Sequence, residues 1–99
     1  MAKRHLSIDP VHPGEILRED VFPALGLTKP ALATALGISR QTLHELFTLK
    51  RSVTPEMALR LEAVVGSNAE MWLALQSERD LWNARRCGKV KGLKRLKAA

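Results

Sequence analysis

Apolar residues recur every three or four positions in five segments of the chain, a spacing that predicts five amphipathic helices. Capping signals bound most of these segments: Ser, Thr or Asn before a segment, proline in its first turn and glycine after it. The expected helices cover residues 13–22, ending before Pro23, and residues 29–36, 40–47, 55–65 and 69–86. No segment alternates as a strand does, so the predicted fold class is all-α.

The second and third expected helices are separated by only three residues, in the stretch "ALGISRQTLHELF". Ala33 is small enough for a close helix crossing, and Gly37 can form the tight turn. Ile38, Leu43 and Leu46 then point inward and fix the third helix on the core. This arrangement predicts a helix-turn-helix, in which the exposed face of the third helix can enter the major groove of DNA.

Composition and charge support one domain with a basic end. The chain has 99 residues, 45% of them apolar and 4% aromatic, and its net charge is +6. Seven cations and no acids lie in residues 85–99, so residues 1–84 carry a net charge of −1. We therefore expect an N-terminal arm over 1–11, a DNA-binding domain over 12–86 and a flexible basic tail over 87–99.

Other features of the sequence argue against catalysis, metal binding and export. His5, His12 and Glu15 lack the spacing of zinc ligands, no nucleophile has an evident base, and no glycine-rich loop could bind phosphate or a cofactor. The single cysteine, Cys87, fits a reducing compartment. Without a signal peptide or a long apolar run, the chain is expected in the cytoplasm and not in a membrane.

Three segments together resemble the HigA-type antitoxins within the lambda-repressor-like, or XRE, helix-turn-helix proteins. They are "HPGEILREDV", "LGLTKPALATALGISRQTLHELF" and "LKRSVTPEMALRLEAVVGSNAEMWLALQSERDLWNAR". The resemblance implies a compact five-helix DNA-binding domain that forms a homodimer and binds a palindromic operator in double-stranded DNA. It also implies that the protein represses its own operon and neutralises a HigB-type toxin, a messenger RNA nuclease.

The resemblance places the DNA contacts on and around the third helix. The implied base readers are Arg40, Gln41, His44 and Glu45. The chemistry agrees, because arginine can pair with guanine, glutamine with adenine and glutamate with the amino group of cytosine. The implied phosphate contacts are Ser39, Thr42, Lys29, Lys50, Arg51 and Thr48. Members of this family often carry Asn-Gly where this chain has Thr48 and Leu49, so the turn after the third helix and the contact of Thr48 stay open.

The fifth helix is the candidate surface for the dimer or the toxin, through Met71, Trp72, Leu75 and Trp82. Packing of a tryptophan into the core is the alternative. Two further functions keep the same fold: a stand-alone repressor without a toxin, and a helical protein-interaction module that does not bind DNA.

Overall fold

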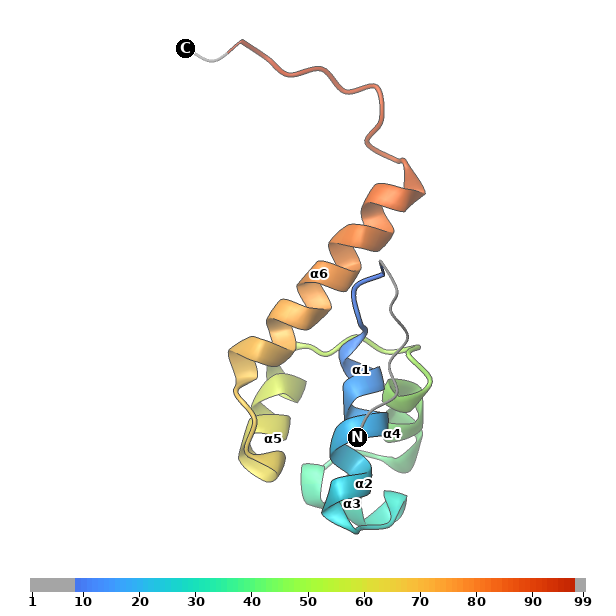
Figure 1. Cartoon of the computed structure of the whole chain (residues 1–99), viewed down its shortest axis with the longest axis vertical. Coiled ribbons are helices and arrows are strands. Elements are labelled where there is room, and N and C mark those ends of the chain that lie inside the picture. The colour runs from blue at the N-terminus through green and yellow to red at the C-terminus, as the bar shows by residue number, and fades with distance from the viewer. Residues whose placement is uncertain (1–8, 98–99) are drawn as a thin grey trace.

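The computed structural model describes residues 9–97 and contains, in that range, five helical runs and no strand (Figure 1). The first run joins α1 (Pro13–Ile16), the π-helical turn η1 (Leu17–Val21) and α2 (Phe22–Leu25). The other four are α3 (Lys29–Leu36), α4 (Arg40–Phe47), α5 (Pro55–Val65) and α6 (Ala69–Cys87). The all-α prediction is confirmed.

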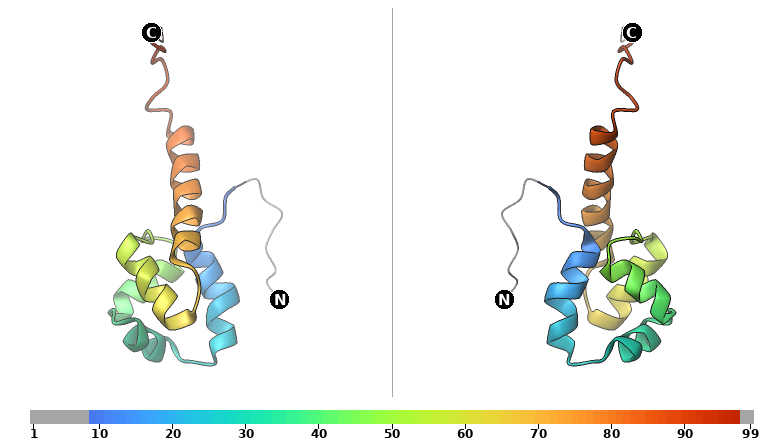
Figure 2. Two further views of the ribbon diagram at one scale, coloured as in Figure 1. Left: turned by 90° about the vertical axis from the view of Figure 1, so that its left-hand side faces the viewer. Right: turned by 90° about the vertical axis from the view of Figure 1, so that its right-hand side faces the viewer.

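Helices α1 to α5 form a bundle, and α6 packs on it with its first half while its second half projects away (Figures 1 and 2). α6 ends at Cys87, where the sequence predicts the start of the basic tail, and Gly88 follows it with a φ of 75°. Residues 89–97 are exposed and continue away from the bundle. Most of the predicted N-terminal arm, residues 1–8, lies outside the described residues.

The core lies between the helices of the bundle and the first half of α6. Its largest fully buried side chains are Leu17, Leu32, Leu36, Leu43, Leu46, Leu61 and Trp72. Trp72 is 0% exposed within a single chain, so the prediction that it forms part of a dimer or toxin interface is wrong. The reason is its position: it stands in the first turn of α6, the part of that helix that covers the bundle.

The helix starts predicted from capping residues are confirmed. A side-chain oxygen accepts a backbone N–H two or three residues into the helix at Thr28 (3.2 Å), Ser39 (3.0 Å), Thr54 (3.2 Å) and Asn68 (2.9 Å). Each bond satisfies one of the N–H groups that a helix start leaves without a partner. These caps fix where α3, α4, α5 and α6 begin.

The first helix is longer than predicted. The sequence indicated an end before Pro23, whereas the helical run continues to Leu25 and ends at Gly26. Proline has no N–H to donate, and its ring clashes with the carbonyl four residues earlier in an α-helix. The π-helical turn η1, in which the N–H of Phe22 donates to the carbonyl of Leu17, widens the helix by one residue just before Pro23. The wider turn lets the helix continue past the proline.

The start of the first helix makes a close backbone contact with α4. Gly14 is buried, and a Cβ atom built on it would overlap the carbonyl oxygen of Leu46. His12 caps this turn, since its Nδ1 accepts the N–H of Gly14 at 2.9 Å. Burial, with the charge of Arg79 second, lowers the pKa of His12, which favours the neutral imidazole that this cap requires. The segment "HPG" therefore sets how closely α1 approaches α4.

We predict that Gly14→Ala destabilises the fold by roughly 1–3 kcal/mol, because the added methyl group would overpack the contact with α4. In a helix without this contact, the same change would stabilise by up to about 1 kcal/mol. The sign of the effect is therefore informative. The midpoint of denaturant unfolding measures it, with Thr34→Ala, at an exposed position of α3, as a control expected within about 0.5 kcal/mol of the parent. A Gly14→Ala protein as stable as the parent would contradict the close approach.

Candidate nucleic-acid interface

Helix α4 has one buried and one exposed face. Leu43, Leu46 and Phe47 are buried on the core side. Arg40, Gln41 and His44 are exposed on the other side, and Glu45 is half-buried beside them. The exposed face thus offers a guanidinium, an amide and an imidazole, at positions 40, 41 and 44 of one short helix, as the sequence predicted.

The turn between α3 and α4 is a Schellman motif. The N–H of Ile38 donates to the carbonyl of Ala33 and the N–H of Gly37 to that of Thr34, both at 3.0 Å, and Gly37 has a φ of 73°. Ala33 is buried with 2% of its surface exposed, as the predicted crossing requires. The helix-turn-helix expected from the sequence is therefore present.

An arginine from α5 holds the end of α3. Nη1 of Arg60 donates to the carbonyls of Leu36 at 2.9 Å and Gly37 at 3.2 Å, and Nη2 binds Glu56 at 2.7 Å. A Cβ atom on Gly37 would lie 2.7 Å from that Nη1 atom, so the glycine also makes room for the arginine. The sequence analysis missed Arg60, since nothing in its local pattern separates it from a solvated residue of α5.

A second arginine holds the end of α4. Nη1 of Arg18, in η1, donates to the carbonyl of Phe47 at 2.6 Å, and its Nη2 binds Glu19 at 2.8 Å. Lys29, at the start of α3, places its ammonium 5.7 Å from the centre of the Phe47 ring. Lys29 is therefore held next to the C-terminal end of α4, with its charge exposed.

The turn after α4 repeats the Schellman pattern without glycine. The N–H of Lys50 donates to the carbonyl of Glu45 at 2.8 Å, the N–H of Leu49 donates to that of Leu46 at 3.2 Å, and Leu49 has a φ of 65°. Leucine thus occupies the left-handed position that the family often gives to glycine. The hydroxyl of Thr48 donates to the carbonyl of His44 at 3.0 Å, which leaves the oxygen as an acceptor but uses its proton within the helix.

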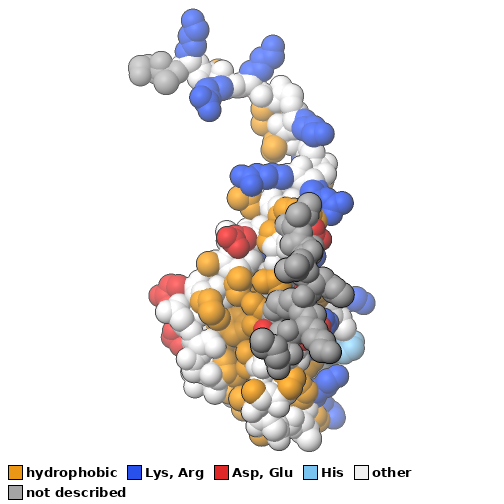
Figure 3. All heavy atoms as spheres, viewed as in Figure 1, with side chains coloured by type: hydrophobic (Ala, Val, Ile, Leu, Met, Phe, Trp, Pro, Cys, Tyr) orange, Lys and Arg blue, Asp and Glu red, His pale blue; other side chains and the backbone are white. Residues whose placement is uncertain are grey.

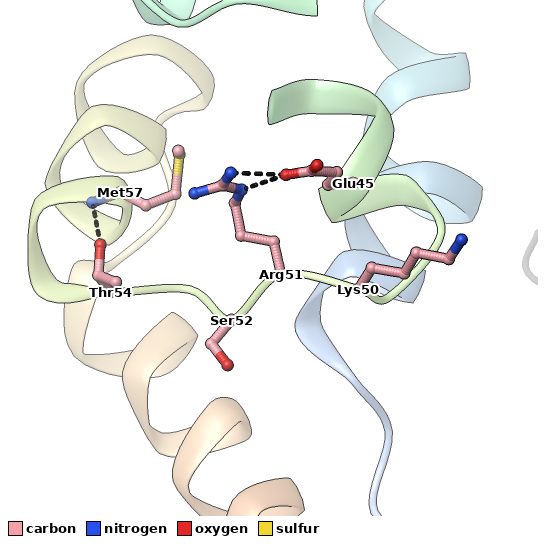
Figure 4. A pocket seen from close by; sticks show the side chains of 6 residues that line it. All are labelled: Glu45, Lys50, Arg51, Ser52, Thr54 and Met57. Carbon is pink, nitrogen blue, oxygen red and sulfur yellow. Dashed lines mark hydrogen bonds and ion pairs between the residues drawn. The ribbon is translucent and has the colours of Figure 1, made fainter. Parts of the chain in front are cut away.

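Glu45 joins α4 to the loop that leads to α5 (Figure 4). Its Oε1 accepts from Nε of Arg51 at 2.9 Å and from Nη2 at 2.5 Å, and its Oε2 accepts from Nε2 of Gln41 at 3.1 Å. The hydrogen bonds from Gln41 and Arg51 lower the pKa of Glu45, so its carboxylate stays ionised at neutral pH. The three side chains form one network on the exposed side of α4.

A hollow of about 430 Å³ lies beside this network. Its lining includes Lys50 and Ser52 of the loop and, at the start of α5, Thr54 and Met57. The loop that forms it is anchored from α6, because Oε1 of Gln76 accepts the N–H of Val53 at 2.8 Å. Gln76 is itself buried and donates to Asp80 at 2.9 Å. The loop carrying Lys50 and Arg51 is therefore held to α4 through Arg51 and to α6 through Val53.

The family model for the helix-turn-helix domain matches residues 17–72, which include α3, the turn and α4. The antitoxin HigA-1 of Vibrio cholerae is 37% identical over 76 residues, covering 77% of this chain and 71% of the relative. This chain belongs to the HigA family of helix-turn-helix antitoxins. Virulence-associated protein I of Dichelobacter nodosus is 42% identical over 71 residues, which cover 72% of this chain and 66% of that protein. The antitoxin HigA of Pseudomonas aeruginosa, in a structure with the higBA promoter, superimposes with a TM-score of 0.81 at 32% identity, over 89% of this chain and 99% of that one.

The residues that this HigA-family chain was predicted to use for DNA gather in three neighbouring segments: the start of α3, the helix α4, and the loop after it. The hydroxyl of Ser39 donates to Oγ1 of Thr42 at 2.9 Å. Of these two hydroxyl groups, only that of Thr42 is then free to donate to an anion. Figure 3 shows basic side chains and a histidine along the edge of the molecule where α4 lies, and acidic side chains on the opposite edge, where α5 and the start of α6 lie. The charge distribution thus favours an anionic partner on the α4 side.

The remaining predicted interface residues lie along α6. Met71 is 41% exposed, while Leu75 and Trp82 are half-buried. Trp82 lies between two arginines, with the guanidinium carbons of Arg79 and Arg86 at 5.7 and 4.5 Å from its ring centre. Among residues 9–97, no helix is both long enough and apolar enough to cross a membrane.

Proposed function

We propose that this chain binds the promoter of its own operon in the cytoplasm, represses it, and neutralises a HigB-type toxin. The observation that carries the DNA-binding part is the exposed polar face of α4, a helix whose core side is buried. Arg18 binds the last carbonyl of α4, and Arg60 binds the carbonyls at the end of α3, where the turn into α4 begins. A helix held in this way can present the same side chains to every binding site. The HigA structure with its promoter supports the assignment.

In this proposal, base readout comes from the exposed start of α4. Arg40 can donate two hydrogen bonds to O6 and N7 of guanine, and Gln41 can pair with N6 and N7 of adenine. His44 lies one turn further along the same face. Because the N-terminal residues of a recognition helix reach the base edges, Arg40 is the residue expected to contribute most to sequence preference.

Phosphate contacts surround this face in the proposal. Lys29, Lys50 and Arg51 are exposed cations on either side of α4, and the hydroxyls of Ser39 and Thr42 lie at its start. Such contacts set the register of the protein on the duplex and carry no sequence information. Thr48 can take part only as an acceptor while its hydroxyl donates to the backbone carbonyl of His44, so it adds little to the binding of an anion. The exposed lysines of the basic tail extend the same sequence-independent attraction.

We also propose that the protein acts as a symmetric dimer through the projecting half of α6. One short helix reads only a few base pairs, and two half-sites multiply the discrimination. On the projecting half, Leu81 is 49% exposed and borders a mainly apolar groove of about 540 Å³ that also includes Ala84 and Val90. A second α6 supplies a complementary apolar stripe of the same length.

We predict that Arg40→Ala weakens binding to the promoter fragment upstream of the gene by roughly 1–3 kcal/mol and changes binding to a scrambled duplex little. Truncation after Gly92 is the comparison. It keeps Val90 of the proposed dimer groove and removes Lys94, Arg95 and Lys97, so it should weaken both duplexes alike and reduce the slope of log affinity against log salt. Fluorescence anisotropy with both duplexes at several salt concentrations measures the two effects. Equal weakening of both duplexes by Arg40→Ala would show that α4 does not read the sequence.

We predict that Leu81→Glu converts a dimer into a monomer at micromolar concentration, because the charge would be buried at the apolar contact. Leu59→Glu is the matched control, since Leu59 is 59% exposed on α5 and lies away from the projecting half of α6. Sedimentation velocity, with and without the promoter duplex, gives the oligomeric state. A parent protein that is monomeric in both conditions would rule out the dimer.

We predict that the protein copurifies with the product of a small neighbouring reading frame when both are expressed together, and that this product alone arrests growth. The same experiment with Trp72→Ala is not informative, since Trp72 is in the core. Met71→Glu and Trp82→Ala test the first turn of α6 and its projecting half separately. If no neighbouring product binds or inhibits growth, the protein is a repressor without a toxin.

A further inference from the structure

We propose that Glu45 is a positioning residue of DNA recognition: its carboxylate holds Arg51 toward the phosphates and Gln41 toward the bases, and it does not itself read cytosine. This inference rests on the proposed function, because it assumes that α4 and the loop after it face DNA. It assigns a different role to a residue that the sequence placed among the base readers.

The hydrogen bonds of Glu45 are already directed within the protein. Oε1 accepts two bonds from Arg51 and Oε2 accepts one from Gln41, at 2.9, 2.5 and 3.1 Å. The side chain of Glu45 is 28% exposed, against 47% for Arg51, so Arg51 is the more accessible member of the pair. Three of the four lone pairs of the carboxylate are already used, so Glu45 keeps one acceptor position, on Oε2, for any base.

The two partners keep the groups that DNA contacts need. A guanidinium has five N–H donors, and Arg51 uses two of them on Glu45, so three remain for a phosphate. The amide of Gln41 has two N–H donors and one oxygen, and it gives one donor to Glu45. The other N–H and the oxygen are the pair that adenine requires. The network therefore orients both side chains without using the atoms that would bind.

Electrostatics supports the same assignment. An unpaired carboxylate on the face that meets DNA is repelled by the phosphates, whereas the Glu45–Arg51 pair is neutral as a unit and exposes the donors of Arg51. Two long side chains ordered before binding lose less conformational entropy on binding. The benefit of Glu45 should therefore depend entirely on Arg51 wherever base contacts are absent.

A double-mutant cycle on a scrambled duplex tests this dependence. We expect Glu45→Ala to weaken binding about two- to tenfold, the range that immobilising one long side chain costs on binding. In the Arg51→Ala background, the same substitution should no longer weaken binding and should tighten it slightly, since only the repulsive carboxylate is removed. A loss of equal size in both backgrounds, or tighter binding of Glu45→Ala in the parent, would overturn the proposal.

Glu45→Gln separates positioning from base readout on the promoter fragment. If Glu45 positions its neighbours, the glutamine keeps one acceptor for Arg51, gives intermediate affinity and leaves the preferred base pair at each operator position unchanged. If Glu45 reads cytosine, one position changes its preference from cytosine to adenine, which refutes the proposal. Unfolding midpoints for all variants control for loss of fold. Because the cycle uses a scrambled duplex, its result is independent of whether Arg40 proves to be a base reader.

Discussion

The position of α4 depends on contacts made by backbone carbonyls. An isolated helix of eight residues is not stable in water, so the direction of its exposed face must be fixed by the rest of the protein. Arg60 binds the carbonyls that end α3, Arg18 binds the last carbonyl of α4, and Gly14 lets α1 touch the backbone at Leu46. The two arginines bind carbonyls at helix ends, where partners within the helix are lacking, and the contact at Gly14 is a close approach of two backbones. The direction of the exposed face of α4 is thus set by contacts from three other elements, α5, η1 and α1.

Local signals were enough to predict most of the helices. The side chains of Thr28, Ser39 and Thr54 each accept a backbone N–H three residues later in the chain. Because both partners lie in the same short segment, these helix starts can be predicted from the local sequence. Pro23 was misleading because its local rule holds only for an α-helix, and a widened turn before it removes the clash. Gly14 was overlooked for a related reason. Nothing within its own helix requires glycine there, and the need arises from a residue 32 positions away in the sequence.

The sequence predicted which residues of α4 are exposed, but not the hydrogen bonds that these residues make with one another and with the following loop. Helical spacing alone puts Arg40, Gln41 and His44 on the face opposite Leu43 and Leu46, and the structure shows these faces. The pairing of Glu45 with Arg51 crosses a turn whose shape the sequence left open, so spacing could not reveal it. Spacing could not show which of the two tryptophans of α6 is buried either. Trp72 and Trp82 belong to one continuous helix, and only the tertiary structure shows that the bundle covers the first and not the second.

Leu49 links the turn to this pairing. A residue other than glycine in the left-handed region costs about 1–2 kcal/mol, so a turn with φ 65° at a leucine must be maintained by its surroundings. The two hydrogen bonds of the turn, from Leu49 and Lys50 back to α4, provide part of that support, and the half-buried leucine side chain provides another part. Glycine would form the same turn without strain, but it would add conformational freedom to the unfolded chain and contribute no side-chain packing. The leucine therefore favours one path of the chain after α4, and this path brings Arg51 back to Glu45, where the two side chains form the pair on which the proposed phosphate contact depends.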